Sequence, residues 1–284
     1  MSLSYDTLIS RRADDWTSAY TTQQIQLYNI SVGMGREGIE KEFPYLLDAP
    51  VPLGVPTYAT LLSGGGAKAI AGAGLNVTKI LHGEERLKVH RPLPPSAELV
   101  SSSWVSEIVD KGPDKGTIIT VTTEGRLASG EALYTSEHVI FARGDGGLGG
   151  SSKSAFAQHV LPERAPDLVH VTQTRPDEAL LYRLNGDRNP LHVDPEVARK
   201  AGFPAPILHG MCSYGMACRA VLASVCDYDA TRIRTFDARF SSPVYPGEAI
   251  HTDIWVDGDV VSFRSRVEAR GVTTLNNGRC LIGA

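Results

Sequence analysis

The sequence predicts an α+β fold of two similar halves, each an antiparallel sheet wrapped on a central helix. A weak internal repeat, strand-like alternation late in each half and one clear helix lead to this prediction. "PLPPSAEL" (Pro92–Leu99) aligns without gaps on "PVYPGEAI" (Pro243–Ile250), an offset of 151 residues (243 − 92). The same offset places Trp104 on Trp255. Duplication of one folding unit explains this pattern.

Composition narrows the class of protein. The 284 residues are 42% hydrophobic and 21% charged, with a formal net charge of −4. This composition is typical of a globular enzyme or binding protein. The chain has no excess of positive charge that would favour binding to nucleic acid. The apolar stretches are too short for a membrane helix, and we find neither a signal peptide nor a peroxisomal tripeptide. We therefore expect a cytoplasmic protein whose four cysteines are reduced and mostly buried.

In the first half, the region that should supply the central helix is poor in helix formers. "LLSGGGAKAIAGAG" (61–74) contains five glycines, each costing up to roughly 1 kcal/mol relative to alanine inside a helix. We expect a short or broken helix here. A phosphate cradle beside Lys68 is a weaker alternative, because the P-loop spacing is absent. Strands are expected within 116–125 and 131–143.

A Gly- and Ser-rich connector follows at 144–166 and separates the two halves. An apolar patch around Phe156 suggests that part of this connector packs against the protein. The predicted organisation is a degenerate N-terminal repeat over 1–150, a linker over 151–166 and a second, catalytic repeat over 167–284.

The second half carries a complete helix. "HGMCSYGMACRAVLASVC" (209–226) places apolar residues at helical spacing, among them Met211, Tyr214 and Val221. "DVVSFRSRVEAR" (259–270) then alternates apolar and polar residues, as a half-buried strand does.

The stretch "NGDRNPLHVD" (185–194) concentrates polar side chains just before a short helix. Asp194 followed by Pro195 predicts a helix start, so His192 lies immediately outside that helix. The Asn189-Pro190 step forces an extended or turned backbone, which can bring Asp187 and His192 together on one water molecule. Such a pair suits general acid–base catalysis. Alternatively, these residues only cap turns and fill the interior.

His209-Gly210 begins the long helix. Backbone N–H groups at a helix N-terminus have no helical partner and lie at the positive end of the helix dipole. A Gly there lets a ligand approach the backbone, so the Gly210 N–H suits a developing oxyanion. Alternatively, Gly210 only starts the helix.

Leu180–Gly210 resembles the signature of the MaoC-like, or hydratase 2, family of enoyl-CoA hydratases. Asn185 departs mildly, since the family prefers Ser, Thr, Gly or Cys at this position. The matching positions are Tyr182, Gly186, Asp187, Asn189, Pro190, Leu191, His192 and Ala198.

The resemblance implies a double hot-dog fold, in which two sheets each wrap a central helix and the N-terminal helix is degenerate. It implies that Asp187 and His192 hold the catalytic water, that Asn189 supports their loop, and that Gly210 donates to the thioester oxygen. It also implies a Gly-rich inter-repeat loop (147–152) near the ligand. The other expected substrate-binding residues are Gly149, Gly150, His209, Tyr58 and Leu62, with Leu61 and Ile70 beside the acyl tail.

The implied reaction is reversible hydration of trans-2-enoyl-CoA to (3R)-3-hydroxyacyl-CoA, with no metal and no organic cofactor. The resemblance also leads us to expect a homodimer whose partner molecule is an acyl-CoA thioester. The alternatives are a hot-dog thioesterase and a non-catalytic acyl-CoA-binding protein. Two weaker ones are a metal hydrolase built on His192, Asp194 and His209, and a Cys212 nucleophile activated by His209.

Overall fold

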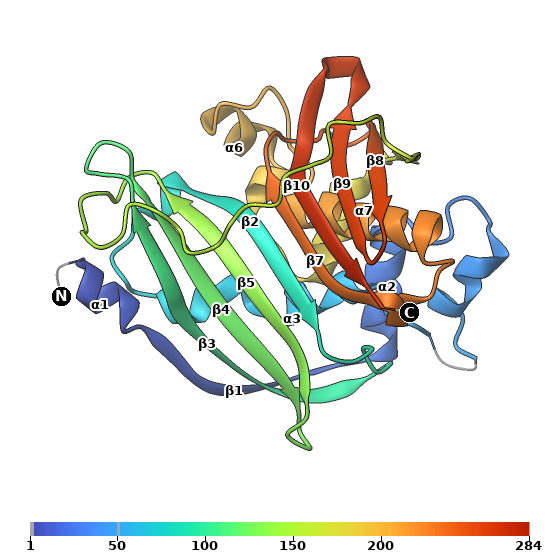
Figure 1. Cartoon of the computed structure of the whole chain (residues 1–284), viewed down its shortest axis with the longest axis horizontal. Coiled ribbons are helices and arrows are strands. Elements are labelled where there is room, and N and C mark those ends of the chain that lie inside the picture. Colours follow the sequence, from blue (N-terminus) through green and yellow to red (C-terminus); the bar gives the residue numbers. More distant parts are fainter. Residues whose placement is uncertain (1–2, 50–51, 284) are drawn as a thin grey trace.

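The computed structural model describes residues 3–49 and 52–283 and contains one ten-stranded antiparallel sheet (Figure 1). The strand order is β1-β3-β4-β5-β2-β7-β10-β9-β8-β6. The strands of the first half are β1 (Arg12–Tyr20), β2 (Ile80–Val89), β3 (Ala97–Asp110), β4 (Thr117–Leu127) and β5 (Ala132–Ala142). Those of the second half are β6 (Leu168–Gln173), β7 (Ile233–Phe240), β8 (Ala249–Asp257), β9 (Val260–Val267) and β10 (Val272–Ile282).

The strand order reads the same from both ends when β1 to β5 are matched with β6 to β10. The two halves therefore share one topology, and β2 pairs antiparallel with β7 to join them edge to edge. Trp104 lies in β3 and Trp255 in the equivalent strand β8, as the repeat offset predicts. The predicted double hot-dog fold is confirmed. The exact domain bounds of 1–150, 151–166 and 167–284 stay a prediction.

Helices cover one face of the sheet, and the second half supplies a complete one, α7 (Gly210–Val225) (Figure 1). The other α-helices are α1 (Tyr5–Ile9), α2 (Thr22–Ser31), α5 (Glu178–Tyr182) and α6 (Pro195–Lys200), together with α3 and α4 described below. Short 3₁₀ helices are η1 (Glu40–Tyr45), η2 (Pro56–Tyr58), η4 (Val77–Lys79), η5 (Arg183–Asn185), η6 (Pro190–His192), η7 (Ala230–Arg232) and η8 (Glu268–Arg270). None of the helices within residues 3–49 and 52–283 is long and apolar enough to cross a membrane.

The central helix of the first half is broken, as predicted. It consists of α3 (Ala59–Leu62), η3 (Gly64–Gly66) and α4 (Ala67–Ile70). Gly64, Gly65 and Gly66 all have positive φ values of 64°, 59° and 67°, which end the right-handed helix. These glycines make a kink between two short helices.

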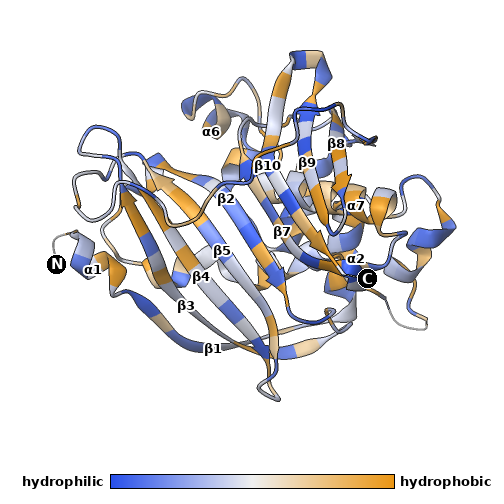
Figure 2. Ribbon diagram, viewed as in Figure 1, coloured by the Kyte–Doolittle hydropathy of each residue, from blue (hydrophilic) through white to orange (hydrophobic). Residues whose placement is uncertain are grey.

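The main hydrophobic core spans both halves. Leu87 of β2, Phe236 of β7 and Tyr214 of α7 belong to one buried cluster. Figure 2 shows hydrophobic and polar residues alternating along the strands. Successive side chains of a strand lie on opposite faces, so such alternation separates an apolar face from a polar one. The buried Arg219 of α7 also pairs with the buried Glu42 of η1, 2.6 Å between Nη2 and Oε1. α7 is therefore anchored to the N-terminal half.

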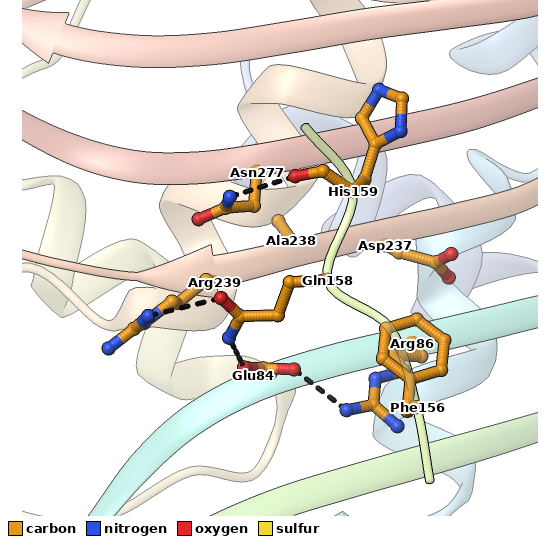
Figure 3. Close-up of a pocket in the computed structure, with 9 residues that line it drawn as sticks. All are labelled: Glu84, Arg86, Phe156, Gln158, His159, Asp237, Ala238, Arg239 and Asn277. Carbon is orange, nitrogen blue, oxygen red and sulfur yellow. Dashed lines mark hydrogen bonds and ion pairs between the residues drawn. The ribbon is translucent and has the colours of Figure 1, made fainter. Parts of the chain in front are cut away.

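The connector between the halves crosses the sheet where β2 meets β7, as the close-up in Figure 3 shows. The Arg86 guanidinium lies 3.4 Å from the centre of the Phe156 ring. The Gln158 amide donates to Glu84 Oε1 at 2.6 Å. The prediction that the region around Phe156 packs against the protein is confirmed.

Candidate active site

The signature loop is shaped by side-chain oxygens that accept hydrogen bonds from nearby backbone N–H groups. Asp187 Oδ1 accepts from the backbone N–H of Asn189 at 3.0 Å, and Asn189 Oδ1 accepts from that of Leu191 at 3.1 Å. Asp194 caps α6 by accepting from Glu196 N at 2.8 Å, as predicted. The chain before α6 therefore folds back on itself, which brings separated side chains to one point.

His192 is almost fully buried and has a defined tautomer. Its Nδ1 lies 2.9 Å from the backbone oxygen of Ile207, which can only accept, so Nδ1 carries the proton and Nε2 has a free lone pair. Burial lowers the pKa of His192, outweighing the backbone hydrogen bond to Ile207 and the nearby Asp187. The imidazole is therefore neutral at pH 7 and able to accept a proton.

The structure brings Asp187, His192 and His209 together, with one polar atom from each side chain within 4.8 Å of the others. The rings of His192 and His209 stack with centroids 3.8 Å apart. Burial, with a smaller contribution from His192, lowers the pKa of His209 to about 4. The Tyr182 ring also packs against His209, with the two ring centroids 4.9 Å apart. An exposed carboxylate thus faces two neutral imidazoles.

Gly210 is the first residue of α7, and the His209 side chain does not cap the helix. A Cβ at this position would lie 3.1 Å from the Phe240 ring. A side chain here would therefore crowd Phe240 and cover the helix N-terminus. Sequence reasoning missed Phe240, because only the pairing of β7 with its neighbours brings it to α7.

Asn185, the one departure from the signature, links the loop to the N-terminal half. Its Nδ2 donates to Ser31 Oγ of α2 at 2.9 Å and to the Tyr182 carbonyl at 2.9 Å. An amide at this position therefore strengthens the contact between the halves beside the site.

The residues predicted to line the acyl tail divide between two cores. Tyr58 is buried in the main core, and Leu61 and Leu62 pack against the same cluster from α3. Ile70 packs instead against a smaller core that contains Leu8. The structure therefore groups Tyr58 with Leu61 and Leu62 but separates Ile70 from them.

The Gly-rich loop is held by Asp110 at the end of β3. Gly149 donates its N–H to Asp110 Oδ2 at 2.7 Å, and Gly147 donates to Oδ1 at 2.9 Å. A Cβ at Gly150 would lie 2.4 Å from the Tyr5 ring. The neighbours of Gly149 and Gly150 are therefore Asp110 and Tyr5, which lie outside the signature loop. The structure therefore does not bring these glycines to the candidate site, and their proposed ligand role stays a prediction.

A second polar cluster, absent from the sequence reasoning, lies beneath the broken helix. Glu85 of β2 is buried, and its Oε2 lies 2.9 Å from Nδ1 of His138 and 3.2 Å from Nε2 of His82. Hydrogen bonds from the two histidines outweigh burial and lower the pKa of Glu85 to about 2. His82 also contacts Phe240, 4.5 Å between ring centroids. One aromatic ring therefore separates this cluster from Gly210.

The geometry counts against two alternatives. Asp194 caps α6, so the trio that could hold a metal contains Asp187 rather than Asp194. Burial raises the pKa of the Cys212 thiol well above its usual range, and its Sγ lies 3.4 Å from the Ser31 carbonyl. A buried, protonated thiol is a poor nucleophile.

Two family models match successive parts of this chain. The MaoC like domain matches residues 157–277, and the MFE-2 hydratase 2 N-terminal domain matches residues 18–144. The chain is 40% identical over 246 residues to the enoyl-CoA hydratase ChsH3 of Mycobacterium tuberculosis, covering 84% of this chain and 85% of that protein. The chain belongs to the MaoC-like hydratase 2 family.

Other members resemble this hydratase 2 family chain over nearly its whole length. It is 33% identical to the peroxisomal enoyl-CoA hydratase 2 of Arabidopsis thaliana, covering 95% of this chain and 93% of that protein. The crystal structure of a MaoC-like dehydratase from Phytophthora capsici has a TM-score of 0.87, with 30% identity and 98% of both chains covered. The resemblance inferred from the signature is confirmed at the level of the family.

Proposed function

We propose that the protein hydrates trans-2-enoyl-CoA thioesters reversibly to (3R)-3-hydroxyacyl-CoA. The observation that carries the proposal is the convergence of Asp187 and His192 on one point beside the N-terminus of α7. Membership of the family adds support, because its named relatives include enoyl-CoA hydratases. Hydratase and dehydratase activities are the two directions of one lyase reaction.

In the proposed mechanism, Asp187 and His192 hold the attacking water. Nε2 of His192 takes a proton while the water oxygen bonds to C3 of the substrate. The electrons of the double bond move toward the thioester carbonyl, and the Gly210 N–H stabilises the oxyanion that develops. A proton returned to C2 completes the addition of one water molecule. These steps use no metal and no organic cofactor.

The acyl tail should run toward the N-terminal half. α7 fills the second half, whereas the break at Gly64–Gly66 interrupts the corresponding helix of the first half. The half-buried Leu61 and Leu62 and the buried Tyr58 lie on the segment before this break. This arrangement favours an acyl chain that extends past α3 toward β5.

The expected homodimer is supported by the exposed apolar side chains on the edge strand β6. Leu168, Val169 and Val171 are 42%, 47% and 48% exposed. An edge strand with such residues is a candidate for contact with a second copy. Light scattering in solution would check the expected mass.

A hydration assay separates the proposal from its alternatives. The purified chain, mixed with crotonyl-CoA and with longer enoyl-CoAs, should remove the enoyl-thioester absorbance without releasing free thiol. Chiral chromatography of the product should give the (3R) isomer. Thiol release would indicate a thioesterase, absence of turnover on the whole panel would indicate a binding protein, and a (3S) product would overturn the assigned stereochemistry.

A further inference from the structure

We propose that His82, Glu85 and His138 form a binding site for one divalent transition-metal ion of the Zn²⁺ class. The three donor atoms lie within 4.8 Å of one another. Nδ1 of His138 and Nε2 of His82 are 2.9 and 3.2 Å from Glu85 Oε2. Ligands of a tetrahedral zinc ion at 2.0–2.1 Å are about 3.3 Å apart, so two edges of the site already have nearly the required length.

A β-bulge in β2 creates this arrangement. Side chains alternate across a strand, so positions 82 and 85 should face opposite sides of the sheet. The pairing with β5 shifts between His82 and Glu84, leaving Gly83 as an extra residue. The extra residue turns His82 to the face on which Glu85 lies opposite His138. A Cβ at Gly83 would lie 3.3 Å from the Val139 carbonyl oxygen, which makes glycine suited to the bulge.

The charge of the cluster favours a cation. The Glu85 side chain is 1% exposed, and it contacts the two histidines and Ser136. No Lys or Arg of the described residues forms a salt bridge with it. A buried carboxylate is costly unless a positive charge compensates it. A divalent ion held by two neutral imidazoles would supply that charge.

The surroundings also resemble those of a metal centre. Ser136 Oγ donates to Glu85 Oε1 at 2.5 Å, which orients the carboxylate and leaves Oε2 facing the histidines. The side chains of His82 and His138 are 22% and 18% exposed, so an ion can enter and keep a water ligand. A carboxylate and two imidazoles form a ligand set that zinc uses widely in proteins.

The competing interpretation is a hydrogen-bonded cluster that binds no ion. Nε2 of His82 lies 3.0 Å from the Glu84 carbonyl oxygen, so it would have to leave this acceptor to bind a metal. The trio of Asp187, His192 and His209 is a second place where added zinc could bind. The experiment must therefore distinguish the two clusters.

Zinc binding to the full chain tests the proposal. After treatment with EDTA and its removal, titration with ZnCl₂ should show one tight equivalent, and CoCl₂ should give the visible absorption of a tetrahedral centre. H138Q should weaken zinc binding by at least roughly 10²-fold, because even an outer-shell change typically costs 10–100-fold. H90Q, whose ring bonds to Thr135 of the same strand pair, and H192Q should both keep the tight site.

Three results would overturn the proposal: no tight equivalent in the wild-type chain, tight binding retained in H138Q, or tight binding lost in H192Q. If H138Q does not fold, anomalous diffraction from wild-type crystals soaked in ZnCl₂ decides. The peak should lie about 2.0–2.1 Å from the donor atoms of His82, Glu85 and His138. A peak elsewhere, or no peak, contradicts the site. Because the measurement is binding, its failure leaves the proposed hydratase activity untouched.

Discussion

Asp187 and His192 have different partners, so their variants remove different contacts: Asp187 accepts from the Asn189 N–H, and His192 bonds to the Ile207 carbonyl. We expect D187N to keep the loop, because an amide oxygen can still accept from the Asn189 N–H. Both D187N and H192A should lower kcat by at least roughly 10²-fold, the usual contribution of a general acid–base group. Steady-state hydration of crotonyl-CoA measures this loss.

Asp194 provides the matched control in the same loop. Its carboxylate caps α6 and takes no part in the proposed chemistry. D194N should therefore keep kcat near the wild-type value and lower stability by about 1 kcal/mol or less. A near wild-type rate in D187N or H192A, or an equal loss in D194N, would contradict the assigned roles.

The neutral state of His192 fixes the direction of the pH dependence. Burial lowers the pKa of His192 below the usual 6.5, and only the neutral ring can accept a proton from water. kcat/KM should therefore stay level as the pH falls through 6.5 and decline only below that value. A profile of kcat/KM between pH 4.5 and 8 checks this, and a decline that begins above pH 6.5 would show a different base.

At the scale of elements, the broken helix offers a test with a built-in control. Gly64 and Gly65 have similar φ values, 64° and 59°, so a leucine at either position meets similar backbone strain. A Cβ at Gly65 would lie 3.6 Å from the His138 ring, whereas one at Gly64 meets nothing within 4 Å. G65L should therefore occupy space beneath the kink, and G64L should not.

We expect G65L to lower kcat/KM for long or bulky enoyl-CoAs at least roughly 10-fold more than for crotonyl-CoA, while G64L leaves this ratio unchanged. A substrate panel measured on both variants checks the acyl-tail path. Gly66 is unsuitable for this test, since its Cβ would lie 2.7 Å from the Val121 side chain and disturb the core. Equal ratios in the two variants would leave the kink with a purely structural role.

The sequence predicted some elements better than others, for physical reasons. The signature loop and α7 depend on local rules of capping and periodicity, so Asp187, His192 and Gly210 could be placed beforehand. The cluster around Glu85 depends on a bulge and on the register between β2 and β5, which local patterns do not encode. Long-range pairing likewise brings Phe240 to α7, which no spacing in the sequence indicates.

Asp237 of β7 lies in the pocket beneath the connector (Figure 3), and burial raises its pKa to about 7. The unfolded chain loses this proton near pH 4, so the free energy of unfolding falls as the pH rises from about 4 to 7. D237N removes the buried charge. Its Tm should exceed that of the wild type by several degrees at pH 8, and the difference should vanish toward pH 4.

Asp229 supplies a control, because its replacement should change Tm in the opposite direction. Hydrogen bonds from the Thr231 side chain and backbone lower the pKa of Asp229. D229N should therefore lower Tm at pH 8. Thermal denaturation of both variants at pH 4, 6 and 8 checks the pair, and a lower Tm for D237N at pH 8 would show that its carboxylate stabilises the fold.

At the scale of the whole molecule, the two halves depend on each other for the main core. Backbone pairs join β2 to β7 from Glu84 opposite Arg239 to Lys88 opposite Thr235. The buried pair of Arg219 and Glu42 connects α7 to η1 across the halves. The candidate active site also combines them, because Asn185 bonds to Ser31. The main core is complete only when both halves are together, whereas the smaller core around Leu8 lies in the first half alone.

We therefore expect the chain to unfold in one cooperative transition, although its sequence contains two repeats. The main core contains Leu87 and Tyr134 of the first half together with Phe236 and Tyr214 of the second. Unfolding of either half would therefore remove apolar contacts from the other half. Differential scanning calorimetry should give one peak whose calorimetric and van't Hoff enthalpies agree. Removing the pair across the halves with R219M, which keeps an apolar stem against the core, should lower the temperature of that peak without splitting it. Two resolved peaks in the wild-type chain, or a split peak in R219M alone, would show that the halves are separate folding units that only associate along β2 and β7.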